Sequence, residues 1–202
     1  MGDLTDRALT ILHEWVKSES LRKHCYAVSD SMKYFAQQRS LRAGMAVDVD
    51  LWEAVGLLHD MDYEKHPNLE RSSTEGHPFV GVKWLKENGW SDEVCRAILS
   101  HADYSGVTPE SDLEKTLRAV DELSGFVVAV TLVRPSKSIA DVELSSVKKK
   151  MKDKAFARAV NREEIVHGAE QLGMPLDEVI TNVIAALKAD AERLGLVGTA
   201  SS

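Results

Sequence analysis

Several signals that would direct this chain to a membrane or to an oxidising compartment are missing. No apolar run comes near the roughly 18 residues that a membrane span needs. The first six residues are acidic and lack the basic and apolar regions of a signal peptide. The chain has two cysteines, Cys25 and Cys95, in separate helix-like contexts, so a disulfide framework is not expected. We predict a cytoplasmic, reduced protein that does not cross a membrane.

Basic residues are also in short supply. The 202-residue chain carries 25 lysines and arginines against 32 aspartates and glutamates, which gives a net charge of −7. Nucleic-acid-binding proteins usually present a basic face, so no nucleic acid partner is expected. A local basic pocket for one phosphate is still compatible with this charge. The hydrophobic content of 44% is ordinary for a soluble protein, and the chain is long enough to bury a core.

Strand signals are nearly absent, and most segments repeat apolar residues with helical period. The one β-branched run, residues 127–133, continues a helical pattern without an intervening turn, so we predict that it is helical. A first helix is predicted to begin at Asp3 or Thr5. Further helices are predicted at approximately residues 21–38, 50–59, 74–87, 91–100 and 112–133, with three or four more between 138 and 194. The expected fold is all-α, in a single domain spanning residues 1–202.

A histidine–aspartate pair, His59-Asp60, ends the apolar helix that begins near residue 50. Burying two titratable side chains costs several kcal/mol unless they are hydrogen-bonded, paired with a charge or bound to a metal. Neighbouring residues on a regular helix point about 100° apart, so both side chains reach one ion most easily where the helix is ending. The acidic residues Asp62 and Glu64, with Pro67 shortly after them, fit such an end.

Four further polar residues stand against helical apolar backgrounds: His24, His77, His101 and Asp121. Together with His59 and Asp60 they would supply six nitrogen and oxygen donors from five helices. This set suits one or two divalent ions, with Fe, Mn, Co, Ni, Zn and Mg as candidates. Two alternatives stay open. In the first, His77, which precedes Pro78, lies near a helix N-terminus and does not bind metal. In the second, His101 contacts substrate instead of metal.

The order of these residues is similar to that of a known family. His24, then His59-Asp60 within GLLHDMD, then Asp121 within AVDELSG resembles the HD-domain superfamily of metal-dependent phosphohydrolases, and the whole chain resembles its small bacterial members. His77 and His101 fall where two-metal members place two further histidines. The resemblance covers about residues 20–126 and implies an all-helical bundle with a central site. Residues of about 138–194 would form a helical extension.

The chain also departs from patterns found in that superfamily. Many members read His-Asp-Ile-Gly-Lys, whereas this chain reads HDMDY from His59, so the role of that lysine cannot be carried over. The His-His-Glu and Gly-Tyr-Pro signals of the cyclic-dinucleotide subgroup are missing as well, since His101 is followed by Ala102. Membership of that subgroup is therefore not expected.

The resemblance implies hydrolysis of a phosphate monoester or phosphoanhydride in a small, nucleotide-like substrate. A divalent ion lowers the pKa of its bound water to about 7, which makes hydroxide available at neutral pH. The candidates for a general acid, or for support behind the metal ligands, are Asp62, Glu75 and Asp103. The candidate phosphate contacts are Lys65, Arg118, Arg134 and Lys137. Residues 134–137 interrupt an apolar helix, which fits either a substrate-facing loop or a solvated basic turn.

Two other functions fit the same residues. Some two-metal relatives in the superfamily cleave carbon bonds with oxygen at a di-iron site, and the six donors would serve that chemistry equally well. A non-catalytic module that senses a ligand is the third possibility. The helices between residues 138 and 194 would cover the site, form a face between identical subunits, or complete the core. The sequence leaves these three roles open.

Overall fold

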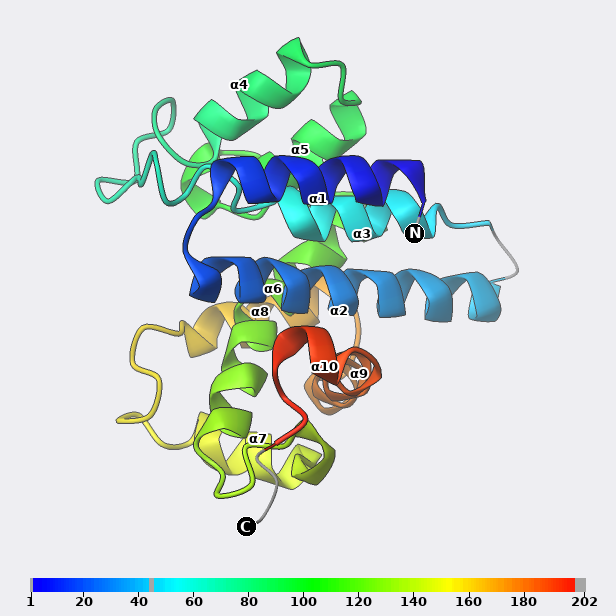
Figure 1. The fold of residues 1–202 in the computed structure, drawn as a ribbon, viewed down its shortest axis with the longest axis vertical. Helices are drawn as coiled ribbons and strands as arrows, with labels where there is room; N and C mark the ends of the chain where they lie inside the picture. Colours follow the sequence, from blue (N-terminus) through cyan, green and yellow to red (C-terminus); the bar gives the residue numbers. More distant parts are fainter. Residues whose placement is uncertain (1, 44–45, 199–202) are drawn as a thin grey trace.

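The computed structural model describes residues 2–43 and 46–198, and the regular elements in these ranges are all helical (Figure 1). Two 3₁₀ turns, η1 (Asp103–Ser105) and η2 (Ile139–Asp141), lie between the longer helices. The α-helices are α1 (Asp3–Trp15), α2 (Glu19–Ala43), α3 (Val49–Leu58), α4 (Phe79–Glu87), α5 (Asp92–Ser100), α6 (Asp112–Leu132), α7 (Leu144–Met151), α8 (Arg162–Leu172), α9 (Leu176–Ala189) and α10 (Ala191–Leu194). The predicted all-α fold is confirmed. Within the described part of the chain, no helix is long and apolar enough to span a membrane.

Helix α3 packs between α1 and α2. This packing fixes the position at which the chain enters the His59-Asp60 pair. Residues 52–58 of α3 are all buried. A Cβ atom on Gly56 would lie 2.5 Å from Cα of Ser29 in α2, so only a glycine allows the two helices to approach so closely. The Ser29 hydroxyl adds a hydrogen bond of 3.0 Å to the Glu53 carbonyl oxygen across the same crossing.

The long helix α6 passes through the middle of the molecule, where it packs against α2, α5 and α8 (Figure 1). Ser111 and Glu114 form a capping box at its start, in which each side chain accepts a hydrogen bond from the other residue's backbone amide. A Cβ atom on Gly168 would lie 2.8 Å from Cα of Ala119, so α8 lies almost directly on the backbone of α6. α6 therefore connects the site to the C-terminal helices.

The C-terminal helices share one hydrophobic core with the helices before them. Ile165 of α8, Val183 of α9 and Leu194 of α10 belong to the same buried cluster as Leu57 of α3 and Phe126 of α6. Of the three roles left open for these helices, this packing supports completion of the core. It also supports our proposal that residues 1–202 form a single domain.

Two helix starts differ from the prediction. α4 begins at Phe79, so Thr74 lies in a loop and His77 precedes the helix. Pro78 explains this, because a residue before proline is disfavoured in the helical conformation, and Gly76 before it has φ of +71°. α3 begins at Val49 instead of residue 50, because Asp48 caps it by accepting a hydrogen bond of 3.0 Å from the Leu51 amide.

Candidate metal centre

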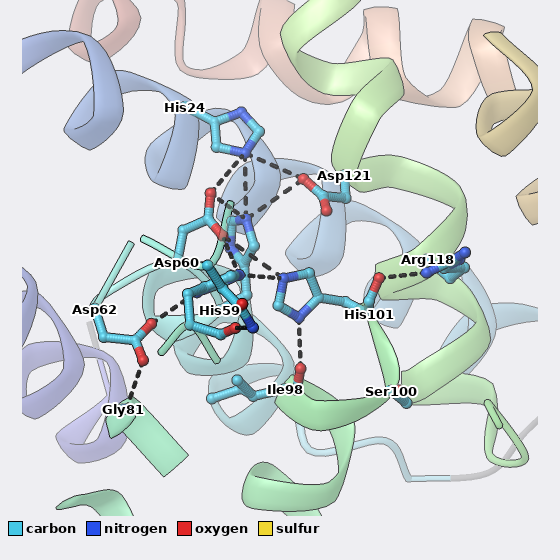
Figure 2. Close-up of polar contacts among 12 residues, drawn as sticks. His24, His59, Asp60, Asp62, Gly81, Ile98, Ser100, His101, Arg118 and Asp121 are labelled. Carbon is cyan, nitrogen blue, oxygen red and sulfur yellow. Dashed lines mark hydrogen bonds and ion pairs between the residues drawn. The ribbon is translucent and has the colours of Figure 1, made fainter. Parts of the chain in front are cut away.

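The six predicted donors converge at one place from two helices, the residues that follow α3 and α5, and the loop before α4. Figure 2 labels five of them, all except His77. His24 and Asp121 lie inside α2 and α6, whereas His59 and His101 are the first residues past α3 and α5. Asp60 follows His59 directly, and His77 ends the loop before α4. Residues so far apart in sequence thus face one centre, as the family resemblance implied.

The first half of the centre contains His24, His59 and Asp121. The Nε2 atoms of the two histidines are 3.2 Å apart. Asp121 Oδ1 lies 3.1 Å from the His24 Nε2 atom and 3.4 Å from that of His59. Asp60 Oδ2 lies 3.6 and 3.5 Å from the same two nitrogens. Two nitrogens and two carboxylate oxygens thus face a common point.

The second half contains His77 and His101, with the other oxygen of Asp60. The Nε2 atoms of these histidines are also 3.2 Å apart. Asp60 Oδ1 lies 3.3 Å from Nε2 of His77 and 3.6 Å from that of His101. Asp60 therefore directs one oxygen at each histidine pair, as a carboxylate that bridges two metal ions would.

Three of the four imidazoles are oriented through their Nδ1 atoms. Nδ1 of His59 bonds the Gly56 carbonyl oxygen at 2.8 Å, and Nδ1 of His101 bonds that of Ile98. Nδ1 of His77 bonds Asp62 Oδ1 at 2.7 Å. Carbonyl and ionised carboxylate oxygens only accept hydrogen bonds, so Nδ1 carries the proton in each ring. In its neutral form each ring then presents a bare Nε2 atom to the centre, as a metal ligand must.

The donor set fits divalent metal ions. Bare Nε2 atoms of His77 and His101 at 3.2 Å repel each other unless a proton or a cation lies near both. One ligand atom from each of His24, His59 and Asp60 lies within 4.8 Å of the others, and the same holds for Asp60, His77 and His101. Imidazole nitrogen and carboxylate oxygen are the donors that suit ions from Mn to Zn.

The electrostatics of the centre favour added positive charge. Burial alone would raise the pKa of Asp60, but the neighbouring imidazoles, His59 first, hold it well below its usual value. Burial would conversely lower the pKa of His59, but the carboxylates of Asp60 and Asp121 raise it to about 9. The two carboxylates therefore stay ionised, and a proton or a metal ion compensates their charge.

A cavity of about 580 Å³ opens onto five of the donors, all except the fully buried His59. Arg71, Tyr104 and Glu122 also line the cavity, and of these three the sequence indicates only Tyr104, as a candidate pocket-lining aromatic residue beside a loop. The Arg71 guanidinium lies over the Tyr104 ring, 5.2 Å from its centroid. Burial, with the carboxylates of Asp121 and Glu164 nearby, raises the pKa of Glu122 to about 7. Arg71 lies in a loop with a φ of +54°, and no periodic pattern in the sequence marks such a position.

Three of the predicted supporting residues lie at or directly behind the centre. Asp62 is 1% exposed, and its second oxygen accepts a hydrogen bond of 2.6 Å from the Gly81 amide. Because both Asp62 oxygens are engaged, the geometry supports a positioning role behind His77 over that of a general acid. Asp103 and Arg118 line the cavity as an ion pair, and Arg118 also donates to the His101 carbonyl oxygen.

The other predicted site residues do not line this cavity. Lys65 lies over the Trp15 ring, 4.9 Å from its centroid, and Glu75 is exposed in the loop before α4. Arg134 lines a different hollow beside α7, and the exposed Lys137 belongs to the same turn. These residues were chosen for their charge, and the sequence carries no information on which way their loops face.

The fold and the donor cluster define a class: an all-helical protein with histidine and aspartate side chains that can hold divalent metal ions. The family model described as HD domain matches residues 21–125, more than half of the sequence. The chain belongs to the HD-domain family. This membership, together with the cluster, indicates a function of the metal-dependent hydrolase type. No solved structure gives a significant match to the chain.

Replacing Asp62 with asparagine should weaken metal binding in the second half of the centre only. The asparagine side chain would carry no charge to hold the His77 Nδ1 proton, and removal of such partners typically lowers metal affinity about 10–100-fold. Titration of the apo-protein with Mn²⁺ should show one weakened and one unchanged site. Glu64→Gln is the control, because Glu64 accepts hydrogen bonds from the Lys17 and Ser18 amides instead. Equal weakening of both sites in D62N would contradict this assignment.

Proposed function

We propose that this protein is a metal-dependent phosphohydrolase that acts on a phosphate monoester or phosphoanhydride of a nucleotide-like small molecule. The observation that carries the proposal is the position of Asp60, with one oxygen facing each histidine pair at 3.3–3.6 Å. The proposed ligands are His24, His59, Asp60, His77, His101 and Asp121. When bound, two divalent ions would supply an activated water and neutralise phosphoryl oxygens.

Charge balance supports a phosphate substrate. The cavity is lined by several carboxylates and, without metal, would repel an anion. Two divalent ions would bring four positive charges against the two ionised carboxylates of Asp60 and Asp121, and the balance would attract phosphate. In this proposal the metal content sets both the chemistry and the affinity for substrate.

The loop between α3 and α4 supplies a cation at the cavity. The Asn68 side chain bonds the Ser72 amide at 2.8 Å and the His77 carbonyl oxygen at 3.0 Å, so the loop is tied to a proposed ligand. The Tyr104 hydroxyl donates to the same His77 carbonyl at 3.1 Å. Arg71 is held over the Tyr104 ring yet its side chain remains 60% exposed. We propose that Arg71 contacts the phosphate or the group attached to it.

The proposal is tested with the purified chain loaded with Mn²⁺, Co²⁺ or Mg²⁺. Phosphate release is measured over a panel of nucleoside mono-, di- and triphosphates and sugar phosphates, with the chelated protein as control. Metal-dependent release from at least one substrate is the expected result. Oxygen consumption by the iron-loaded protein without phosphate release would replace hydrolysis with oxidation. Ligand binding without any turnover would support a sensing role instead.

Replacing Arg71 with glutamine should raise the KM for the phosphorylated substrate by about tenfold, because one charged contact is lost. The kcat should change less, since Arg71 lies outside the proposed metal ligands. Lys65→Gln removes the same charge from a side chain that lies over Trp15 and does not line the cavity. Steady-state kinetics of the two variants side by side test the assignment. A larger effect for K65Q than for R71Q would show that the loop contacts substrate through another residue.

A further inference from the structure

A second hollow lies between the end of α6 and the start of α7, in the part of the molecule farthest from α4 (Figure 1). Its volume is about 540 Å³, and Val130 and Val133 form apolar walls. None of the residues that line it also lines the metal cavity. The hollow is therefore a separate feature of the surface.

The lining of this hollow is basic, although the chain as a whole is acidic. Arg134, Lys149 and Lys150 line it, and the described lining residues include no aspartate or glutamate. Lys150 lies 3.7 Å from an Asp153 carboxylate oxygen, whereas Lys149 forms no ion pair within the described part of the chain. In a chain with net charge −7, three cations around one hollow create a local field that attracts anions.

Arg134 is held in place at this hollow. Its Nη1 donates to the Ser146 hydroxyl oxygen at 3.2 Å, and Ser146 is itself a lining residue. Its Nε is buried and has no acceptor in the described structure. Ser145 and Ser146 lie in the first turn of α7, whose start has no side-chain cap. A fixed guanidinium and two hydroxyls offer donors to an anion.

We propose that this hollow binds the phosphate group of a small organic molecule, whose apolar part rests on Val130 and Val133. The three cations and the two serines would hold the phosphate. The volume is sufficient for a phosphate group with a ring attached, since ligand pockets begin at about 300 Å³. The site is independent of the metal centre and does not rest on the proposed hydrolase activity.

The test measures binding of phenyl phosphate and inorganic phosphate to the full chain by calorimetry. Phenyl phosphate should bind several-fold more tightly than inorganic phosphate, because the ring covers the valine walls. Arg134→Gln should weaken phenyl phosphate binding about tenfold and Lys149→Gln about threefold. Lys149 is exposed, so K149Q should fold even if R134Q does not. Lys148→Gln is the matched control, since Lys148 does not line the hollow and pairs with Asp177 at 2.7 Å.

Three outcomes would overturn the proposal. The first is an unaltered chain to which neither probe binds. The second is equal weakening by K148Q and K149Q, which would reveal diffuse attraction along α7. The third is unchanged binding in both R134Q and K149Q, which would place the bound phosphate elsewhere, for example at the metal centre. Folding of each variant is checked by circular dichroism before titration.

Discussion

In the proposed two-metal hydrolase, replacing Asp60 with asparagine should reduce the metal content from two ions to fewer than one per chain and nearly abolish hydrolysis. Among the described residues, Asp60 is the one side chain that faces both histidine pairs, with distances of 3.3–3.6 Å to the four Nε2 atoms. Asparagine keeps one oxygen but loses the negative charge, so the two ions would no longer share a charged ligand. Removing a residue that only hydrogen-bonds to a metal ligand typically lowers metal affinity or activity about 10–100-fold. Removing a ligand that two ions share should lower them further. Elemental analysis and phosphate release measure the two effects.

A matched series shows whether the loss comes from bridging. Asp121 contacts His24 and His59 but, in the described structure, is not within ion-pair distance of His77 or His101, so Asp121→Asn should remove one ion and leave the other. Asp177→Asn alters an exposed carboxylate that pairs with Lys148 and should change neither metal content nor rate. Loss of a single ion in both D60N and D121N would refute the bridging role of Asp60.

The helical framework was predictable because each helix carries its own periodic pattern and start signals. The buried run before His59 was recognised in the sequence and occurs in the structure, whereas the capping box between Ser111 and Glu114 was not singled out beforehand. The loop character of His77 was missed although Pro78 was visible, because the polar residues before it continued a plausible helix. The donors were found because each was a polar residue on an apolar background and because their order resembled that of a known family.

The walls of the cavity were much less predictable. Arg71 and Tyr104 are far apart in sequence and come together only through the fold, and nothing local in the sequence marks Arg71. Arg134 was selected because it interrupts an apolar helix, and the break is real, since α6 ends at Leu132. The direction in which the following turn faces depends on its packing against α7, where Arg134 meets Ser146. Charge and chain breaks identify loops, whereas long-range packing decides which cavity they line.

Replacing Gly56 with alanine should destabilise the protein more than any exposed substitution. The new Cβ would lie 2.5 Å from Ser29 Cα and 2.7 Å from Ser29 N, both backbone atoms that no side-chain rotation can move. Forcing an extra methyl group into a packed core typically costs about 1–3 kcal/mol of unfolding free energy. The Gly56 carbonyl oxygen also accepts the hydrogen bond from His59 Nδ1, at 2.8 Å. Separation of α2 from α3 should therefore move His59 away from His24 as well and weaken metal binding.

Gly125→Ala is the control that separates packing from helix propensity. Gly125 also lies inside a helix, α6, but its new Cβ would meet His24 Nδ1 at 3.5 Å, an ordinary contact distance. Alanine is preferred over glycine in a helix by about 0.5–1 kcal/mol, so G125A should be neutral or slightly stabilised in urea unfolding. Equal stability of G56A and the unaltered chain would mean that α3 can shift without cost. In that case the close approach of α2 and α3 at Gly56 does not position His59. The placement of Asp60 between the two histidine pairs would then depend on the bound metal ions.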